Sequence, residues 1–158
     1  MREEVGFDVC CGRVFREDAP FEPFPDASSG HLDLDPVPAS VSLARSFVRL
    51  SLVDLDVDGQ DVALLLTSEL VTNAVLHART PVQVGVFIDR VKAMVCVGDC
   101  LGETSTLTPQ PPSDDRPGGR GLALVADLAQ SWGTTRYVGG KTVWFVLQRS
   151  LSSALSVG

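Results

Sequence analysis

The chain of 158 residues is long enough for about one domain. Its 20 Asp and Glu outnumber 13 Lys and Arg, and the net charge of −7 argues against nucleic acid as a partner, because phosphate backbones are bound by a surplus of basic side chains. A hydrophobic fraction of 44% excludes wholesale disorder. With no run of about 18 apolar residues and no signal-like start, we expect a cytoplasmic protein without a membrane partner, whose four cysteines are reduced.

The first half of the chain is predicted to hold an arm, one strand and two helices. Residues 1–29 show no strong period, with a turn-like Ser-Ser-Gly at the end, and we expect a flexible N-terminal arm. Polar and apolar side chains alternate over residues 31–35, which predicts a short strand. Apolar positions fit one helical face over residues 40–52, with Ser40 as the expected N-cap, and a longer Leu-rich helix is expected over 59–78.

The second half alternates strands with a loop and a helix. Strands are predicted over residues 82–88 and 91–97, with a tight turn at Asp89-Arg90. A Pro-rich loop follows, and the last elements are a helix over 122–130, strands over 131–137 and 142–148, and a tail over 150–158. Strands joined by hairpins, with helices between them, predict an α+β fold: a two-layer sandwich with a mostly antiparallel sheet.

Three polar residues of the long helix form the first candidate site. Glu69, Asn73 and His77 are spaced i, i+4 and i+8, so they share one face of the helix, in line with the apolar Val62 and Leu66. A carboxylate, an amide and an imidazole beside a core are costly unless a ligand satisfies them, and a hydrated Mg²⁺ with phosphates would do so. A partly exposed helix end is the equally good alternative.

Two further features are ambiguous when taken alone. Asp99 ends a buried strand, where its carboxylate accepts a hydrogen bond from an amine such as that of adenine, or only nucleates a turn. Gly119 and Gly121 open a helix, where backbone amides approach an anion, or only form a hinge. Gly140-Lys141-Thr142 is not the end of a P-loop, because a strand follows it instead of a helix.

The order of these features resembles the histidine-kinase-like ATPase superfamily with its Bergerat fold. Within that superfamily, the chain is most similar to the stand-alone anti-sigma-factor serine/threonine kinases of bacteria. The resemblance covers about residues 30 to 148, and it implies a nucleotide-binding domain over 30–149 with helices on one face of a sheet of mixed direction. The phrases that carry it are Ser68-Glu69-Leu70-Val71-Thr72-Asn73-Ala74 with His77-Ala78, Gly119-Arg120-Gly121-Leu122-Ala123-Leu124-Val125, Trp132-Gly133, and Gly140-Lys141-Thr142-Val143-Trp144-Phe145.

The resemblance also implies a role for each matching residue. Asn73 would be the Mg²⁺ ligand that bridges the ATP phosphates, Glu69 the general base, His77 a phosphate contact, Asp99 the carboxylate that reads adenine, and Thr142 its support. Residues 102–118 would form the ATP lid, and the amides of the glycine box would hold phosphate. The remaining implied nucleotide contacts are Gly102, Gly119, Arg120, Gly121 and Leu122. The chain departs from the family at Leu101, where a glycine is usual.

The activity implied by the resemblance is an ATP- and Mg²⁺-dependent protein kinase. Its partners would be an anti-sigma-factor antagonist, phosphorylated on Ser or Thr, and a sigma factor, which relatives bind directly. The alternative is a regulatory module that binds ATP and acts by capturing a partner. Relatives often form homodimers, for which residues 32–52 are a candidate surface. Because the chain is acidic, Arg120 and Lys141 are the local cations expected to help Mg²⁺ hold the phosphates.

Overall fold

The computed structural model describes residues 28–100, 119–137 and 140–149, with backbone alone at 28–29, 119–122 and 135–137. The predicted lid and tail, Leu101, Gly102 and residues 1–27 of the predicted arm lie outside the described residues. The elements are β1 (Ser28–Leu34), α2 (Ala39–Ser51), α3 (Val57–Asn73), the π-helical turn η1 (Ala74–Ala78), β2 (Val82–Ile88), β3 (Lys92–Asp99), α4 (Gly119–Leu128), β4 (Ser131–Tyr137) and β5 (Gly140–Gln148).

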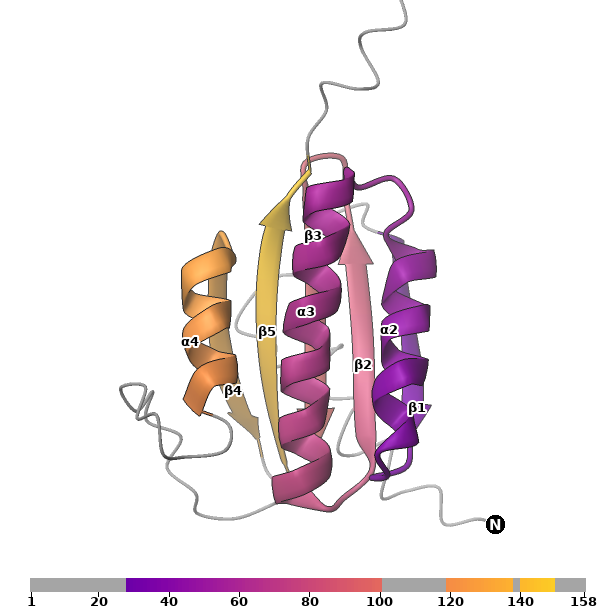
Figure 1. The fold of residues 1–158 in the computed structure, drawn as a ribbon, viewed down its shortest axis with the longest axis vertical. Helices are drawn as coiled ribbons and strands as arrows, with labels where there is room; N and C mark the ends of the chain where they lie inside the picture. The colour runs from indigo at the N-terminus through magenta and orange to yellow at the C-terminus, as the bar shows by residue number, and fades with distance from the viewer. Residues whose placement is uncertain (1–27, 101–118, 138–139, 150–158) are drawn as a thin grey trace, which may run out of the picture.

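The described strands form one open sheet in the order β1-β2-β3-β5-β4. All four pairings are antiparallel, so the mixed direction implied by the resemblance is not found among these strands. The three helices cover one face of the sheet, with α3 between α2 and α4 (Figure 1). The predicted two-layer α+β fold is therefore confirmed.

The main core lies between the helices and the sheet. Because side chains alternate across a strand, every second residue of β2, β3 and β5 faces the helices. The residues that meet there are apolar and buried: Val48 of α2, Leu66 and Val71 of α3, Val125 of α4, Val84 of β2, Val95 of β3 and Phe145 of β5. The opposite face of the sheet carries a smaller cluster of Phe87, Met94, Cys96 and Val146, against which Trp144 packs.

Two helix starts differ from the expectation. The N-cap of α2 is Pro38, and Ser40 lies inside the first turn, where its buried Oγ donates to the Asp35 carbonyl oxygen at 2.7 Å. Ser40 therefore fastens the turn before the helix instead of capping it. At α3, the Asp56 side chain accepts from the Gly59 backbone N–H at 2.7 Å, so the helix begins two residues earlier than predicted.

The predicted long helix is in fact two kinds of helix. The α-helical hydrogen-bond pattern ends at Asn73, and η1 continues as a single π turn that contains His77. The turn ends at Arg79, whose φ of 54° is the one positive value among the described non-glycine residues. Single π turns are rare and occur frequently at functional sites, which directs attention to this end of the helix.

Strand boundaries are close to those predicted. β2 and β4 match residues 82–88 and 131–137, and the Asp89 backbone N–H closes the expected hairpin turn by donating to the Lys92 carbonyl oxygen. β1 differs, because Ser28 and Ser29 pair with Ile88 and Phe87 in the sheet instead of forming a turn. In the described part of the chain, no helix has the length and apolar character needed to cross a membrane.

Candidate functional site

The polar row on α3 lies on the side of the helix away from α2. Arg45 of α2 donates to Ser68 Oγ at 2.6 Å and reaches the Leu64 carbonyl oxygen at 3.5 Å, which places that flank of α3 against α2. Because each residue of an α-helix is rotated by about 100°, Glu69 and Asn73 lie about 100° and about 140° around the helix from Ser68, on the flank away from α2. The neighbouring helix on that side of α3 is α4 (Figure 1). Both side chains are half-buried, and neither forms a hydrogen bond with a described residue.

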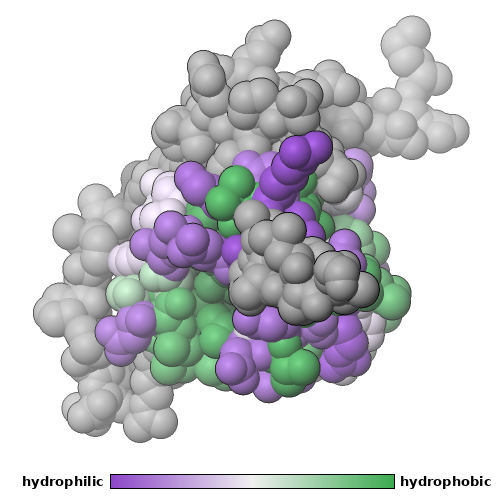
Figure 2. Space-filling view, turned by 90° about the horizontal axis from the view of Figure 1, so that it is seen from above, coloured by the Kyte–Doolittle hydropathy of each residue, from purple (hydrophilic) through white to green (hydrophobic). Residues whose placement is uncertain are grey.

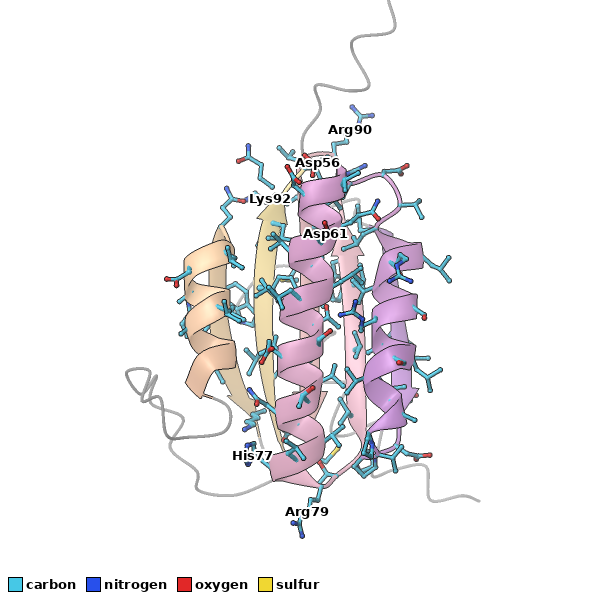
Figure 3. All side chains as sticks on the ribbon, viewed as in Figure 1. Asp56, Asp61, His77, Arg79, Arg90 and Lys92 are labelled. Atoms are coloured by element: carbon cyan, nitrogen blue, oxygen red, sulfur yellow. The ribbon has the colours of Figure 1, made fainter. Side chains whose placement is uncertain are left out.

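The π turn determines where His77 points. In a continued α-helix, each step of four residues advances by about 40°, which would carry His77 from the flank toward the sheet. A π turn holds more residues, so the side chain is rotated back. His77 is accordingly exposed, and Figure 3 shows it on the side of η1 toward α4, whereas Arg79 points away from the molecule. The predicted row of Glu69, Asn73 and His77 therefore does lie along one side of the helix.

Asp99 lies on the sheet beneath this end of the helix. It shares a face with Val95 and Val97, which pack against the helices, so its carboxylate is on the helix-covered side. Only 4% of the side chain is exposed, and its Oδ2 lies 3.8 Å from Lys141 Nζ. Lys141 is the residue directly opposite Asp99 on β5, so the two side chains share that face. This ion pair is the contact that the sequence did not predict.

Thr142 is not brought to Asp99. It pairs with Gly98, so strand alternation places its side chain on the opposite face, with Cys96 and Trp144. The hydroxyl is buried, and Oγ1 has no hydrogen-bond partner among the described residues. The expected support of an adenine site by this side chain does not fit the geometry, because the sheet separates Thr142 from the carboxylate that it was expected to assist.

The glycine box forms the first turn of α4. The helix begins at Gly119, three residues earlier than predicted, so Gly119, Arg120, Gly121 and Leu122 are helical. Figure 1 shows that this turn lies at the same end of the molecule as η1 and the start of β5. The first backbone N–H groups of a helix have no partners within it and attract anions. The box is therefore placed to offer amides to a phosphate near Asn73.

The two described cysteines differ in state. Cys96 is free and buried, and burial raises the pKa of its thiol, so it stays protonated at neutral pH. Cys100, the residue after Asp99, is disulfide-bonded, and the prediction of four reduced cysteines is wrong there. The Cys100 backbone N–H also donates to Thr80 Oγ1 at 2.9 Å, which fastens the end of β3 to the segment after η1.

The donor set fits a magnesium nucleotide better than a metal bound by protein alone. Among the described residues, no group of three His, Cys, Asp or Glu could hold a metal ion. Mg²⁺ in nucleotide sites keeps several waters and takes only one or two protein ligands, the rest being phosphate oxygens. A single amide at Asn73, a carboxylate at Glu69, a helix N-terminus for phosphate and a buried carboxylate for a base meet these requirements.

Comparison with known proteins agrees with this geometry. The profile described as "Histidine kinase-like ATPase domain" matches residues 34–147. The crystal structure of the RsbU and RsbW domains of Rv1364c from Mycobacterium tuberculosis is 20% identical, with a TM-score of 0.58, and the match covers 77% of this chain but 32% of that one. The histidine kinase domain of the blue-light activated histidine kinase from Erythrobacter litoralis EL346 is 22% identical, covering 74% and 63%, with a TM-score of 0.43. No curated protein matches.

These comparisons differ in what they establish. At 20% identity, the likeness to the mycobacterial structure supports the fold, and the chain spans about a third of that longer protein. The family profile is stronger, because it runs from the end of β1 into the last residues of β5 and includes every described element of the candidate site. The chain belongs to the histidine kinase-like ATPase domain family.

Proposed function

We propose that the chain binds ATP with Mg²⁺ and transfers the γ-phosphoryl group to a Ser or Thr of an anti-sigma-factor antagonist. The observation that carries this proposal is that Glu69 and Asn73, without partners in the described chain, lie toward the same end of the molecule as the buried Asp99, which ends β3. A glutamate suits the proton transfer, an asparagine suits the binding of the metal, and a buried aspartate suits the binding of the adenine ring.

Each residue has a distinct role in the proposed reaction. The Asp99 carboxylate accepts a hydrogen bond from the amino group of adenine, and the first turn of α4 offers its N–H groups to phosphate. The Asn73 side-chain oxygen would hold Mg²⁺, which when bound neutralises charge on the phosphates. Glu69 accepts the proton that the attacking Ser or Thr hydroxyl loses as its oxygen bonds to the γ-phosphorus and ADP leaves.

The choice of partner depends on the family phrases in the sequence. The resemblance implies an anti-sigma-factor antagonist as phosphoryl acceptor and a sigma factor as a bound partner. The likeness to a structure that contains RsbU and RsbW domains supports the same kind of regulatory domain. Two copies of the chain would pair through β1 and α2, which form an edge of the described sheet and the helix beside it (Figure 1).

Nucleotide titration combined with a transfer assay tests the proposal. Calorimetry should show that the wild type binds ATP strongly only with Mg²⁺, and γ-labelled ATP should label a purified antagonist protein. Asn73→Ala should lose most of the Mg²⁺-dependent affinity while its thermal melting stays near that of the wild type. The Lys92→Met protein, altered at the far end of the same sheet, is the matched control and should bind as the wild type does (Figure 3).

Two outcomes would overturn parts of the proposal separately. No binding of any nucleotide by the folded wild type would contradict the ATP site. Tight Mg²⁺-dependent binding without transfer to any antagonist or other protein would favour the alternative, a regulatory module that acts by partner capture.

A further inference from the structure

The ammonium group of Lys141 lies in an unusual position. Four-fifths of its side chain is buried beside a carboxylate that is almost fully buried. The 3.8 Å between Lys141 Nζ and Asp99 Oδ2 is longer than a hydrogen bond of this kind, about 2.7–3.2 Å, so no ammonium proton is donated to this oxygen. Lys141 makes no other hydrogen bond with a described residue. Its donors thus have no acceptor among the described residues, so water or a ligand has to supply one.

The pair offers one acceptor and one donor, side by side. An ionised carboxylate only accepts hydrogen bonds, and an ammonium group only donates them. Their complement is a ligand with a donor next to an acceptor. The edge of adenine has this arrangement, because its 6-amino group donates and the neighbouring ring nitrogen N1 accepts.

We propose that Lys141 is a specificity-determining residue, which donates to N1 of adenine while Asp99 accepts from the 6-amino group. This inference rests on the proposed ATP site, and it moves Lys141 from the expected phosphate contact to the base. The reason is positional: Lys141 lies opposite Asp99 in the register of β3 and β5 and is held at its carboxylate. In the free protein the same ammonium neutralises Asp99, so the base enters a site whose buried charge is already balanced.

Two-point reading predicts which bases are rejected. Hypoxanthine has an oxygen at position 6 and a proton on N1. Bound in the place of adenine, it would set its O6 acceptor against the accepting carboxylate of Asp99 and its N1–H donor against the donating ammonium group of Lys141. Guanine has the same exchange at these positions. Unpaired buried groups of this kind give strong discrimination, because the mismatched ligand leaves them unsatisfied. The wild type should therefore bind ATP much more tightly than ITP or GTP.

The test pairs a ligand atom with a side chain. 1-Deaza-ATP keeps the 6-amino group and replaces N1 by C–H. The wild type should bind it roughly ten-fold or more weakly than ATP in calorimetry with Mg²⁺, because a hydrogen bond to a charged group is lost. Lys141→Met should bind the two nucleotides equally, whereas Lys141→Arg and the control Lys92→Met should keep the difference.

The outcomes separate this inference from its alternatives. If Lys141→Met binds ATP and still discriminates against 1-deaza-ATP ten-fold, Lys141 does not read N1. A second outcome would also overturn the inference. The wild type would show no preference for ATP over 1-deaza-ATP, and Lys141→Met would lose affinity for ATP, 1-deaza-ATP and GTP by the same factor. Lys141 would then be a phosphate contact. A wild type that binds no nucleotide contradicts the proposed function itself.

A second pair of variants covers loss of folding. Lys141→Met leaves a buried carboxylate without its counter-charge and can fail to fold. Asp99→Asn with Lys141→Met removes both charges. Asp99→Asn alone should still prefer ATP to 1-deaza-ATP, and the double variant should not. The same preference in both proteins would contradict the inference, with circular dichroism reporting that each is folded.

Discussion

The two ends of α3 use polar side chains in different ways. At its start, these groups close turns within the chain: Asp56 accepts from the Gly59 N–H, and the Asp89 carboxylate accepts from the backbone N–H groups of Val91 and Lys92, each at 2.7 Å. Figure 2 views the molecule onto this end and shows hydrophilic side chains interspersed with hydrophobic ones. Val57, at the first position of α3, is 74% exposed there.

At the other end of the helix, three polar side chains of the helix itself have no such partners. Glu69, Asn73 and His77 form no hydrogen bond or ion pair with a described residue, and the α-helix is followed by the π turn that contains His77. Asp99 is buried near this end with Lys141. The difference suggests a rule for the two ends of α3: the polar side chains at its start are paired and hold the fold, whereas Glu69, Asn73 and His77 at its end are unpaired and available to a ligand.

The largest effect is expected at Glu69, where the rule predicts a loss of chemistry without a loss of stability. Glu69→Gln keeps the size and removes the base, so phosphoryl transfer to the antagonist should fall by about 10²–10⁴-fold. ATP affinity and the melting temperature should stay within error of the wild type. Asp61→Asn, the same change at an exposed position of α3, is the control and should transfer normally (Figure 3). Equal transfer by Glu69→Gln and the wild type would remove the proposed base.

Gly133 belongs to a motif shared with the family, but it serves packing and not ligand binding. A Cβ at Gly133 would lie 2.5 Å from Trp144 Cζ2, so the glycine is required by the ring that packs on it from the neighbouring strand. Gly133→Ala should lower the free energy of unfolding by about 1–3 kcal/mol in urea titration. Gly30→Ala is the matched control, because its Cβ would meet Phe47 at an ordinary 3.7 Å. Similar stability of the two variants would contradict the packing role.

The cap at the start of α3 should give the next smaller effect, in stability alone. Asp56→Ala removes the acceptor of the Gly59 N–H and should lower the free energy of unfolding by about 1 kcal/mol. Mg²⁺-dependent ATP affinity should not change, because the cap lies at the end of α3 far from Asn73 (Figure 3). A fall in ATP affinity larger than two-fold in the folded variant would show that the two ends are coupled.

The fold could be predicted where the pattern of one segment decides the outcome. The alternating Val82, Val84 and Val86 of β2 predicted the bounds of that strand correctly, since such a pattern is local. The π turn could not be predicted from the sequence. It differs from an α-helical turn in which backbone carbonyl each N–H group contacts, and Val71 and Val75 are buried in the core on either side of this change. The predicted N-cap of α2 was wrong because the Ser40 hydroxyl donates to the Asp35 carbonyl oxygen, which precedes the helix.

The candidate site divides in the same way. The flank shared by Glu69 and Asn73 follows from helical periodicity and needs no knowledge of the sheet. The partner of Asp99 depends on the register between β3 and β5, which is set by two strands about 40 residues apart. A shift of one residue exchanges the faces of Lys141 and Thr142. The sequence contained both residues, but only the paired strands show which one lies beside the carboxylate.

The smallest effect is expected at Asp54, and it marks the limit of the rule. Its carboxylate lies 3.9 Å from Arg149 Nη2, but 81% of the side chain is exposed, so water screens the pair. Arg149 also donates to the Asp89 carbonyl oxygen, and this bond remains when the carboxylate is removed. Asp54→Asn should therefore change the free energy of unfolding by less than about 0.5 kcal/mol. Arg149→Met removes both contacts and should lower the free energy of unfolding by more than Asp54→Asn does. If urea titration finds the two variants equally stable, the hydrogen bond from Arg149 to the Asp89 carbonyl oxygen contributes little to the stability of this end.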